Sequence, residues 1–140
     1  MSAHIQSVTF PAVDGGPLLE GVLHRPKGPG PFPAAVVCHP HPLMGGRMDD
    51  AIVVAVCRVL ATRDWATLRF NFRGAGRSVG SFDDGRGEMD DVAGAVDFMC
   101  AQAKVDAKGQ QKKSSGYLAT AHNHPSLFSG AFASMDGCPV

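Results

Sequence analysis

The 140-residue sequence lacks an excess of either charge, since Lys plus Arg and Asp plus Glu number 13 each. The balance gives no electrostatic reason to expect nucleic acid or an anionic membrane as a partner. No apolar run approaches the roughly 20 residues that a membrane span requires. The first residues also lack the basic and apolar regions of a signal peptide. We therefore expect a cytoplasmic protein with neither a nucleic-acid nor a membrane partner.

The sequence also lacks the C-x-x-C spacing of a metal or redox site. Its four cysteines are Cys38, Cys57, Cys100 and Cys138. Buried thiols in a reducing compartment explain this usage more simply than disulfides or a metal. The apolar content of 44% and charged content of 19% are typical of one small globular domain. The 17 Gly and 10 Pro residues cluster in loops, as a fold with its site on loops requires.

Regular elements are readable over the first hundred residues. Residues 5–10 alternate, and residues 18–24 follow a turn, which predicts an antiparallel pair of strands. Residues 34–38 and 65–72 are apolar without alternation, as in strands covered on both faces. Between them, a helix capped by Asp49 or Asp50 is apolar around most of its circumference, so we expect it to be largely buried.

From Glu88, apolar residues recur with the spacing of a one-faced helix, at Met89, Val92, Val96 and Met99. Two strands followed by strand, helix, strand and helix predict an α/β fold. Its sheet would be a partial doubly wound one with antiparallel edge strands at the N-terminus. After residue 102 the pattern stops. We therefore expect one unit over residues 1–102 and a divergent tail over 103–140 that packs poorly and adds little to the sheet.

Two loops carry a family resemblance. Residues 34–46 (AAVVCHPHPLMGG) and 66–78 (ATLRFNFRGAGRS) resemble the amino-terminal half of an α/β-hydrolase. The type is that of a small serine hydrolase or dienelactone hydrolase, and the resemblance covers residues 1–102 approximately. It implies cleavage of ester, thioester or amide bonds in a small molecule through an acyl-enzyme. It implies no metal and no organic cofactor.

The resemblance further implies that the loop after the third strand donates a backbone N–H to the oxyanion of the tetrahedral intermediate. Pro40 and Pro42 have no N–H to give. Analogy with the family favours the N–H of His41, with that of Leu43 as a further candidate. We expect the imidazole rings in this loop to be structural. The residues expected to shape the two loops are His39, Gly45, Gly46, Arg73, Gly74 and Gly76.

Residues 76–80 form a literal G-x-S-x-G, the nucleophile-elbow pattern, with Ser78 at its centre. A formal acid and base follow downstream, among Asp83, Asp90, Asp97, His122 and His124. An elbow is a sharp strand-to-helix turn, whereas residues 73–75 separate the strand from Gly76 and residues 81–85 have no helix character. Ser78 is therefore only a weak candidate nucleophile.

At the place of the family's elbow, residues 116–121 are similar to Gly-Tyr-Ser-x-Gly-Ala, but Leu118 replaces the nucleophile. No base can activate a leucine. Only 22 residues follow it, which leaves no room for the acid and the His. We expect a truncated or frame-altered chain that is inactive alone. Two alternatives stay open: a minimal serine hydrolase using Ser78, and a non-catalytic pseudo-hydrolase that binds partners or self-associates through an open sheet edge.

Two weaker patterns compete with this interpretation. The pairs His39-x-His41 and His122-x-His124, with Cys38 and Cys138, could be read as a zinc site. Residues 74–76 after a strand suggest a dinucleotide loop, but no third glycine opens a helix. We expect neither a metal nor a cofactor.

Overall fold

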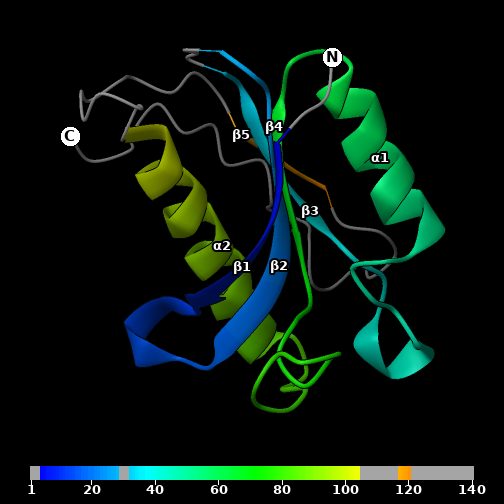
Figure 1. The fold of residues 1–140 in the computed structure, drawn as a ribbon. Coiled ribbons are helices and arrows are strands. Elements are labelled where there is room, and N and C mark those ends of the chain that lie inside the picture. Colours follow the sequence, from blue (N-terminus) through cyan, green and yellow to red (C-terminus); the bar gives the residue numbers. More distant parts are fainter. Residues whose placement is uncertain (1–3, 29–31, 105–116, 121–140) are drawn as a thin grey trace.

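The computed structural model describes residues 4–28, 32–104 and 117–120. Five strands form one sheet in the order β1-β2-β4-β3-β5, and the long helices α1 and α2 cover its opposite faces (Figure 1). The elements are β1 (His4–Pro11), η1 (Val13–Gly15), β2 (Leu18–Arg25), β3 (Ala34–Cys38), η2 (Pro42–Met44), α1 (Ala51–Ala61), β4 (Ala66–Phe70), α2 (Arg86–Lys104) and β5 (Tyr117–Thr120). The fold is the expected α/β arrangement with an antiparallel edge.

The antiparallel part of the sheet consists of β1, β2 and β4. β1 pairs with β2 along its whole length, from His4 opposite Arg25 to Pro11 opposite Leu18. β2 continues the sheet by pairing antiparallel with β4. The alternating residues of β1 suit this edge position, because one face packs on the core and the other meets water.

β3 and β4 form the parallel centre of the sheet. Their register runs from Ala34 opposite Ala66 to Cys38 opposite Phe70, so both strands end at the same level. All five residues of β3 are buried. Ala34, Val36 and Cys38 belong to the core under α2, whereas Val37 packs against Val53 and Cys57 of α1. The uninterrupted apolar run therefore reflects burial on both faces, as predicted.

α1 is the crossover between the two parallel strands. Asp50 caps it, because its carboxylate accepts a hydrogen bond from the N–H of Ile52 at 3.0 Å. The expectation of a largely buried helix is wrong. Only Val53 and Cys57 are buried, while Ile52 and Val59 are 51% and 56% exposed. A single helix on an open sheet presents one stripe to the strands, and in the described residues nothing covers its outer side.

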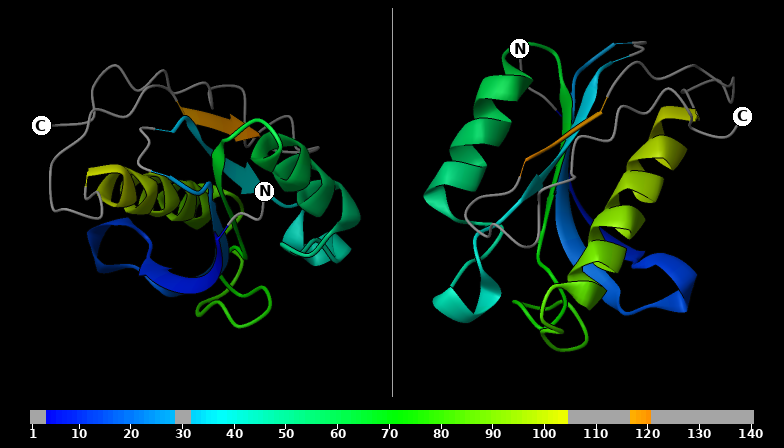
Figure 2. Two further views of the ribbon diagram at one scale, coloured as in Figure 1. Left: turned by 45° about the horizontal axis from the view of Figure 1, so that its top comes forward. Right: turned by 180° about the vertical axis from the view of Figure 1, so that it is seen from behind.

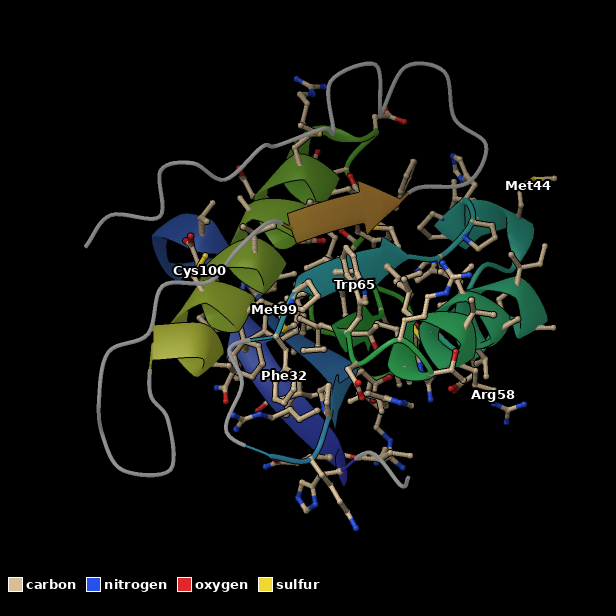
Figure 3. All side chains as sticks on the ribbon, turned by 90° about the horizontal axis from the view of Figure 1, so that it is seen from above. Phe32, Met44, Arg58, Trp65, Met99 and Cys100 are labelled. Carbon is tan, nitrogen blue, oxygen red and sulfur yellow. The ribbon has the colours of Figure 1, made fainter. Side chains whose placement is uncertain are left out.

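α2 packs on the other face of the sheet. Ala95 and Met99 are buried in the core, and Figure 3 shows Met99 between α2 and the strands. The predicted one-faced helix is confirmed, with one exception: Met89 is 52% exposed. In the first turns of the helix, the buried side carries the acidic residues Glu88 and Asp91 instead.

β5 departs from the expectation for the tail. Residues 117–120 pair parallel with β3, from Ala34 opposite Tyr117 to Val37 opposite Thr120, on the side away from β4 (Figure 2). A short parallel strand therefore follows residue 102, where the sequence pattern indicates none. A four-residue strand needs no sustained apolar period, because its pairing with β3 uses only main-chain groups. The rest of the tail lies outside the described residues.

Candidate functional site

The loops that follow β3 and β4 lie side by side at one end of the sheet (Figure 1). They begin level with each other, since Cys38 pairs with Phe70. Farther out, the rings of His41 and Phe82 are 4.9 Å apart. Residues 39–46 and 73–87 are thus neighbours in space. In open α/β sheets, ligands bind in the crevice beyond the carboxyl ends of parallel strands.

His39 joins the two loops at their base. Its Nε2 accepts the N–H of Phe72 at 3.1 Å, and its Nδ1 donates to the carbonyl of Pro40 at 2.6 Å. Because a main-chain N–H can only donate, Nε2 must be unprotonated and the proton sits on Nδ1. Burial lowers the pKa of His39, so the ring is held neutral. Both ring nitrogens are thus engaged with main-chain groups, which favours a structural role for this imidazole.

The loop after β3 folds into the short turn η2. The N–H of Leu43 donates to Nδ1 of His41 at 3.2 Å, and the N–H of Met44 donates to the carbonyl of His41 at 3.0 Å. The N–H of Leu43, one of the two predicted oxyanion donors, is therefore occupied by a neighbouring side chain. An oxyanion would have to displace the His41 ring to reach it. The N–H of His41 stays a prediction.

The glycine pair of this loop has distinct roles. Gly45 ends η2 in the left-handed region, with φ 84°. Gly46 has no room for a side chain, because a Cβ would collide with the carbonyl of Pro40 and approach Nδ1 of His39. The pair lets the chain turn closely against the main chain of Pro40.

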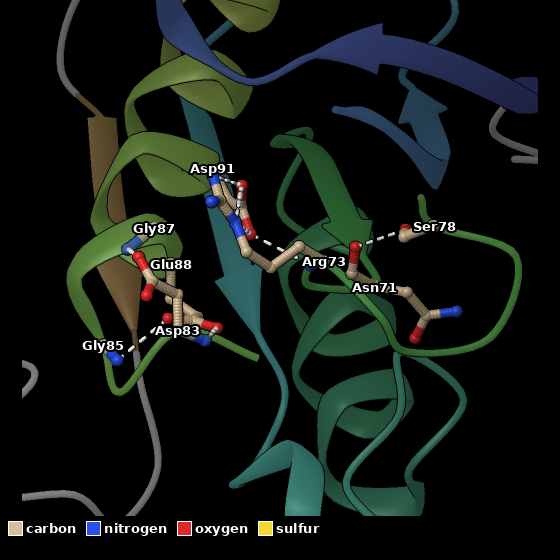
Figure 4. Close-up of polar contacts among 8 residues, drawn as sticks. All are labelled: Asn71, Arg73, Ser78, Asp83, Gly85, Gly87, Glu88 and Asp91. Carbon is tan, nitrogen blue, oxygen red and sulfur yellow. Dashed lines mark hydrogen bonds and ion pairs between the residues drawn. The ribbon is translucent and has the colours of Figure 1, made fainter. Parts of the chain in front are cut away.

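Ser78 lies inside the second loop, with only 6% of its surface exposed. Its hydroxyl donates to the carbonyl of Asn71 at 2.6 Å (Figure 4) and accepts the N–H of Glu20 at 3.0 Å. The chain neither enters Ser78 from a strand nor leaves it into a helix, since β4 ends at Phe70 and α2 starts at Arg86. This geometry favours a structural role.

None of the acids and bases considered as partners of Ser78 is among the described hydrogen-bond partners of its hydroxyl. Asp83 accepts the N–H of Gly87 at the start of α2, and Asp90 and Asp97 are exposed on that helix. His122 and His124 lie outside the described residues.

Arg73 anchors the start of the second loop to α2. Its guanidinium forms a two-point ion pair with Asp91, at 2.8 Å from Nη2 and 3.1 Å from Nε, and its main-chain N–H donates to the same carboxylate at 2.9 Å (Figure 4). Asp91 is fully buried. Hydrogen bonding to Asp91 raises the pKa of Arg73. Gly74 then turns the chain with φ 76°.

Glu88 anchors the end of the same loop. Its two carboxylate oxygens accept the N–H groups of Asp83 and Gly85, each at 2.9 Å. The carboxylate of Asp83 in turn accepts the N–H of Gly87 at 3.1 Å. This is a form of capping box, in which side chains satisfy the free N–H groups of a helix start. Sequence reasoning missed Glu88 and Asp91. The available signal was two acids three residues apart on the apolar side of a helix.

The structure also bears on the cysteine thiols and on the alternative of a zinc site. Burial raises the pKa of Cys38 to about 12 and also raises that of Cys57, so neither thiol is a ready nucleophile. Within residues 4–28, 32–104 and 117–120, no three His, Cys, Asp or Glu side chains come together as a metal site requires. Cys138 lies outside those ranges, as does the second His pair. The absence of a metal stays a prediction.

The comparison of residues 116–121 with an elbow does not fit the structure. Leu118 pairs with Ala35 within β5, whereas an elbow follows the end of a strand. The proposed nucleophile position is therefore mid-strand, and the residues after β5 lie outside the described part.

Solved structures of similar fold support this description. An α/β serine hydrolase homologue from Coxiella burnetii matches with a TM-score of 0.66 at 28% identity, covering 86% of this chain and 53% of that chain. A putative α/β hydrolase of unknown function from Agrobacterium tumefaciens matches with a TM-score of 0.66 at 35% identity, covering 81% and 48%. A serine hydrolase without a lid from Xanthomonas campestris matches with a TM-score of 0.65 at 27% identity, covering 86% and 51%.

Taken with the strand order and the paired loops, these likenesses define the class: the described residues form a partial α/β-hydrolase fold. The chain spans about half the length of these solved structures. An uncharacterized protein from Rickettsia prowazekii is 43% identical over 67 residues, which are 48% of this chain and 28% of that protein. No protein-family model matches the chain. Among the described residues, no helix has the length and apolar character needed to cross a membrane.

Proposed function

We propose that this chain provides the substrate-side loops of an α/β-hydrolase acting on small ester-like molecules, and that alone it does not hydrolyse them. In this proposal the two neighbouring loops line the substrate site, and the N–H of His41 is the candidate oxyanion donor. The observation that carries the proposal is the state of Ser78. The chain's only G-x-S-x-G serine is buried, with its hydroxyl hydrogen-bonded to two main-chain groups.

A serine nucleophile needs the opposite environment. Its Oγ must project from a strained turn toward the substrate, and a base must take its proton. The Ser78 proton is instead directed to the carbonyl of Asn71. Freeing this hydroxyl would leave the N–H of Glu20 and the carbonyl of Asn71 without their partner. Such a loss costs on the order of 1–3 kcal/mol for each buried group.

The test is labelling of the intact chain with a fluorophosphonate probe, read by mass spectrometry, alongside hydrolysis of a p-nitrophenyl ester. We expect neither an adduct on Ser78 nor hydrolysis above the background. A Ser78→Ala variant is the matched control. Labelling and turnover that both disappear in Ser78→Ala would overturn the proposal in favour of a minimal serine hydrolase. Turnover that persists in Ser78→Ala would overturn the claim that the chain is inactive.

A non-catalytic binding role is the second candidate, and the end position of β5 in the sheet favours it. β5 pairs with β3 on one side, and no other described strand pairs with its second edge. Unpaired strand edges are templates for pairing with another chain. Self-association through this edge predicts a concentration-dependent mass in light scattering, whereas a constant monomer mass would contradict it.

We also propose a reducing compartment such as the cytoplasm. Cys38 and Cys57 are buried free thiols, which persist where disulfide formation is disfavoured.

A further inference from the structure

Met48 is the point where side chains from β4 and its loop hold the segment leading into α1. Its N–H donates to Oδ1 of Asn71 at 2.8 Å, and its carbonyl accepts from Nη1 of Arg69 at 3.0 Å. Arg69 also bonds the carboxylate of Asp49 at 2.5 Å. The exit of the loop after β3 is therefore fixed from the side of β4.

The other end of the Asn71 amide is equally engaged. Its Nδ2 donates to Oε1 of Glu20 at 2.7 Å, and the same oxygen accepts the N–H of Arg77 at 2.7 Å. One amide thus bonds the first loop through its oxygen. Through its nitrogen and the Glu20 carboxylate, it is linked to the second loop. Asn71 is buried, with 3% of its surface exposed, so water does not easily replace these partners.

The surrounding chain is shaped to this arrangement. A Cβ on Gly76 would collide with the Asn71 amide and with the Glu20 carboxylate. The main-chain groups of the same pair are also joined, since the N–H of Asn71 donates to the carbonyl of Glu20 at 3.0 Å. Ser78 adds its bridge between the Asn71 carbonyl and the Glu20 N–H.

We propose that Asn71 and Glu20 are positioning residues that couple the loop after β3 to the loop after β4. Ser78 supports this coupling, because its hydroxyl bridges the main chains of the same two residues. The inference rests on the proposed function only in taking these two loops as the substrate site. An amide suits position 71, because it can accept from one loop and donate to the oxygen of residue 20 at the same time. A carboxylate at position 71 could not donate.

Coupling differs from a set of local contacts by acting at a distance. Glu20 bonds Asn71 and Arg77 but not Met48. Removal of its carboxylate should leave the Asn71 amide without its anchor and weaken the hydrogen bond from Met48. If each contact acted only locally, the same removal would alter the N–H of Arg77 and leave that of Met48 unchanged.

The experiment is amide hydrogen exchange, resolved by NMR, on the full chain. We expect Glu20→Ala to reduce protection at Met48 and at Arg77 by about three- to tenfold each, the effect of weakening one hydrogen bond. Glu20→Gln should retain protection at both, because the Gln oxygen can accept from Nδ2 of Asn71 and from the N–H of Arg77 as the carboxylate does. Met99→Ala is the control, since it weakens the core without touching these residues.

A swap of groups provides a second measurement if Glu20→Ala does not fold. Asn71→Asp places two carboxylates together and should lose protection at Met48. The double variant Asn71→Asp with Glu20→Gln restores a donor–acceptor pair and should recover it. Unchanged Met48 exchange in Glu20→Ala, or no recovery in the double variant, would overturn the coupling. Exchange does not depend on activity, so this test can fail while the fluorophosphonate test succeeds, and the reverse.

Discussion

Two ion pairs with the same chemistry differ in burial, and this difference allows a sharp test of what holds the second loop. Both join an arginine at or just after β4 to an aspartate. The Asp91 side chain is 0% exposed and that of its partner Arg73 is 15% exposed, whereas Asp49 is 71% exposed beside Arg69 at 14%. Substitution of each aspartate by alanine removes the same atoms.

The expected costs in the free energy of unfolding are far apart. Asp91→Ala leaves the guanidinium and the main-chain N–H of Arg73 without their acceptor, and breaking a buried pair on one side costs about 3–5 kcal/mol. Asp49→Ala breaks an exposed contact, which is worth about 0–1 kcal/mol. Asp91→Asn keeps an acceptor but loses the charge, so we expect an intermediate loss.

Urea unfolding followed by circular dichroism measures all three variants against the original chain. A domain of this size has a total stability on the order of 5–15 kcal/mol. The loss expected for Asp91→Ala is comparable to the lower end of this range, so that variant is at risk of being unfolded even without urea. In that case the loss for Asp91→Asn is compared with the loss for Asp49→Ala. Equal losses for Asp91→Asn and Asp49→Ala would refute the argument, because burial would then make no difference to the pair.

Three further predictions concern residues away from that pair. Burial lowers the pKa of both His39 and His24 below their usual 6.5; stability should therefore be complete above this pH and fall below it, as the unfolded chain takes up protons first. Urea midpoints across that range should show the slope, and a His39→Gln variant should flatten it. Gly46→Ala should cost roughly 1–3 kcal/mol through the clash with the main chain, and an unchanged melting temperature would speak against the close approach. Asp64 has φ 59°, so Asp64→Gly should raise the free energy of unfolding by up to about 1 kcal/mol, and a lowered urea midpoint would show that the turn is unstrained.

The strands of the sheet centre were predictable because burial leaves a direct trace in composition. All five residues of β3 are apolar, and all five are buried. The same inference failed for α1, where Ile52 and Val59 are as apolar as their buried neighbours and yet exposed. Composition records which residues tolerate burial, but the number of layers around a helix decides which are covered.

The polar skeleton of the site was harder to foresee. The loop glycines, the structural histidine and the closeness of the two loops follow from local patterns. The roles of Glu20 and Asn71 do not, because they depend on contacts across 51 positions of the chain. β5 was missed for a related reason. Its four residues are defined by pairing with β3 and not by a period of their own.

The bridge made by Ser78 has a consequence for the recognition of enzymes by short motifs. A glycine stands at position 76 because the Asn71 amide and the Glu20 carboxylate fill the space of a Cβ, and another at position 80 because φ is 92° there. Between them, a small hydroxyl is the group that can join two main-chain partners. Packing requirements alone therefore produce the G-x-S-x-G pattern that also marks a catalytic elbow. A pattern search on this chain therefore selects a serine that is buried and bonded to two main-chain groups.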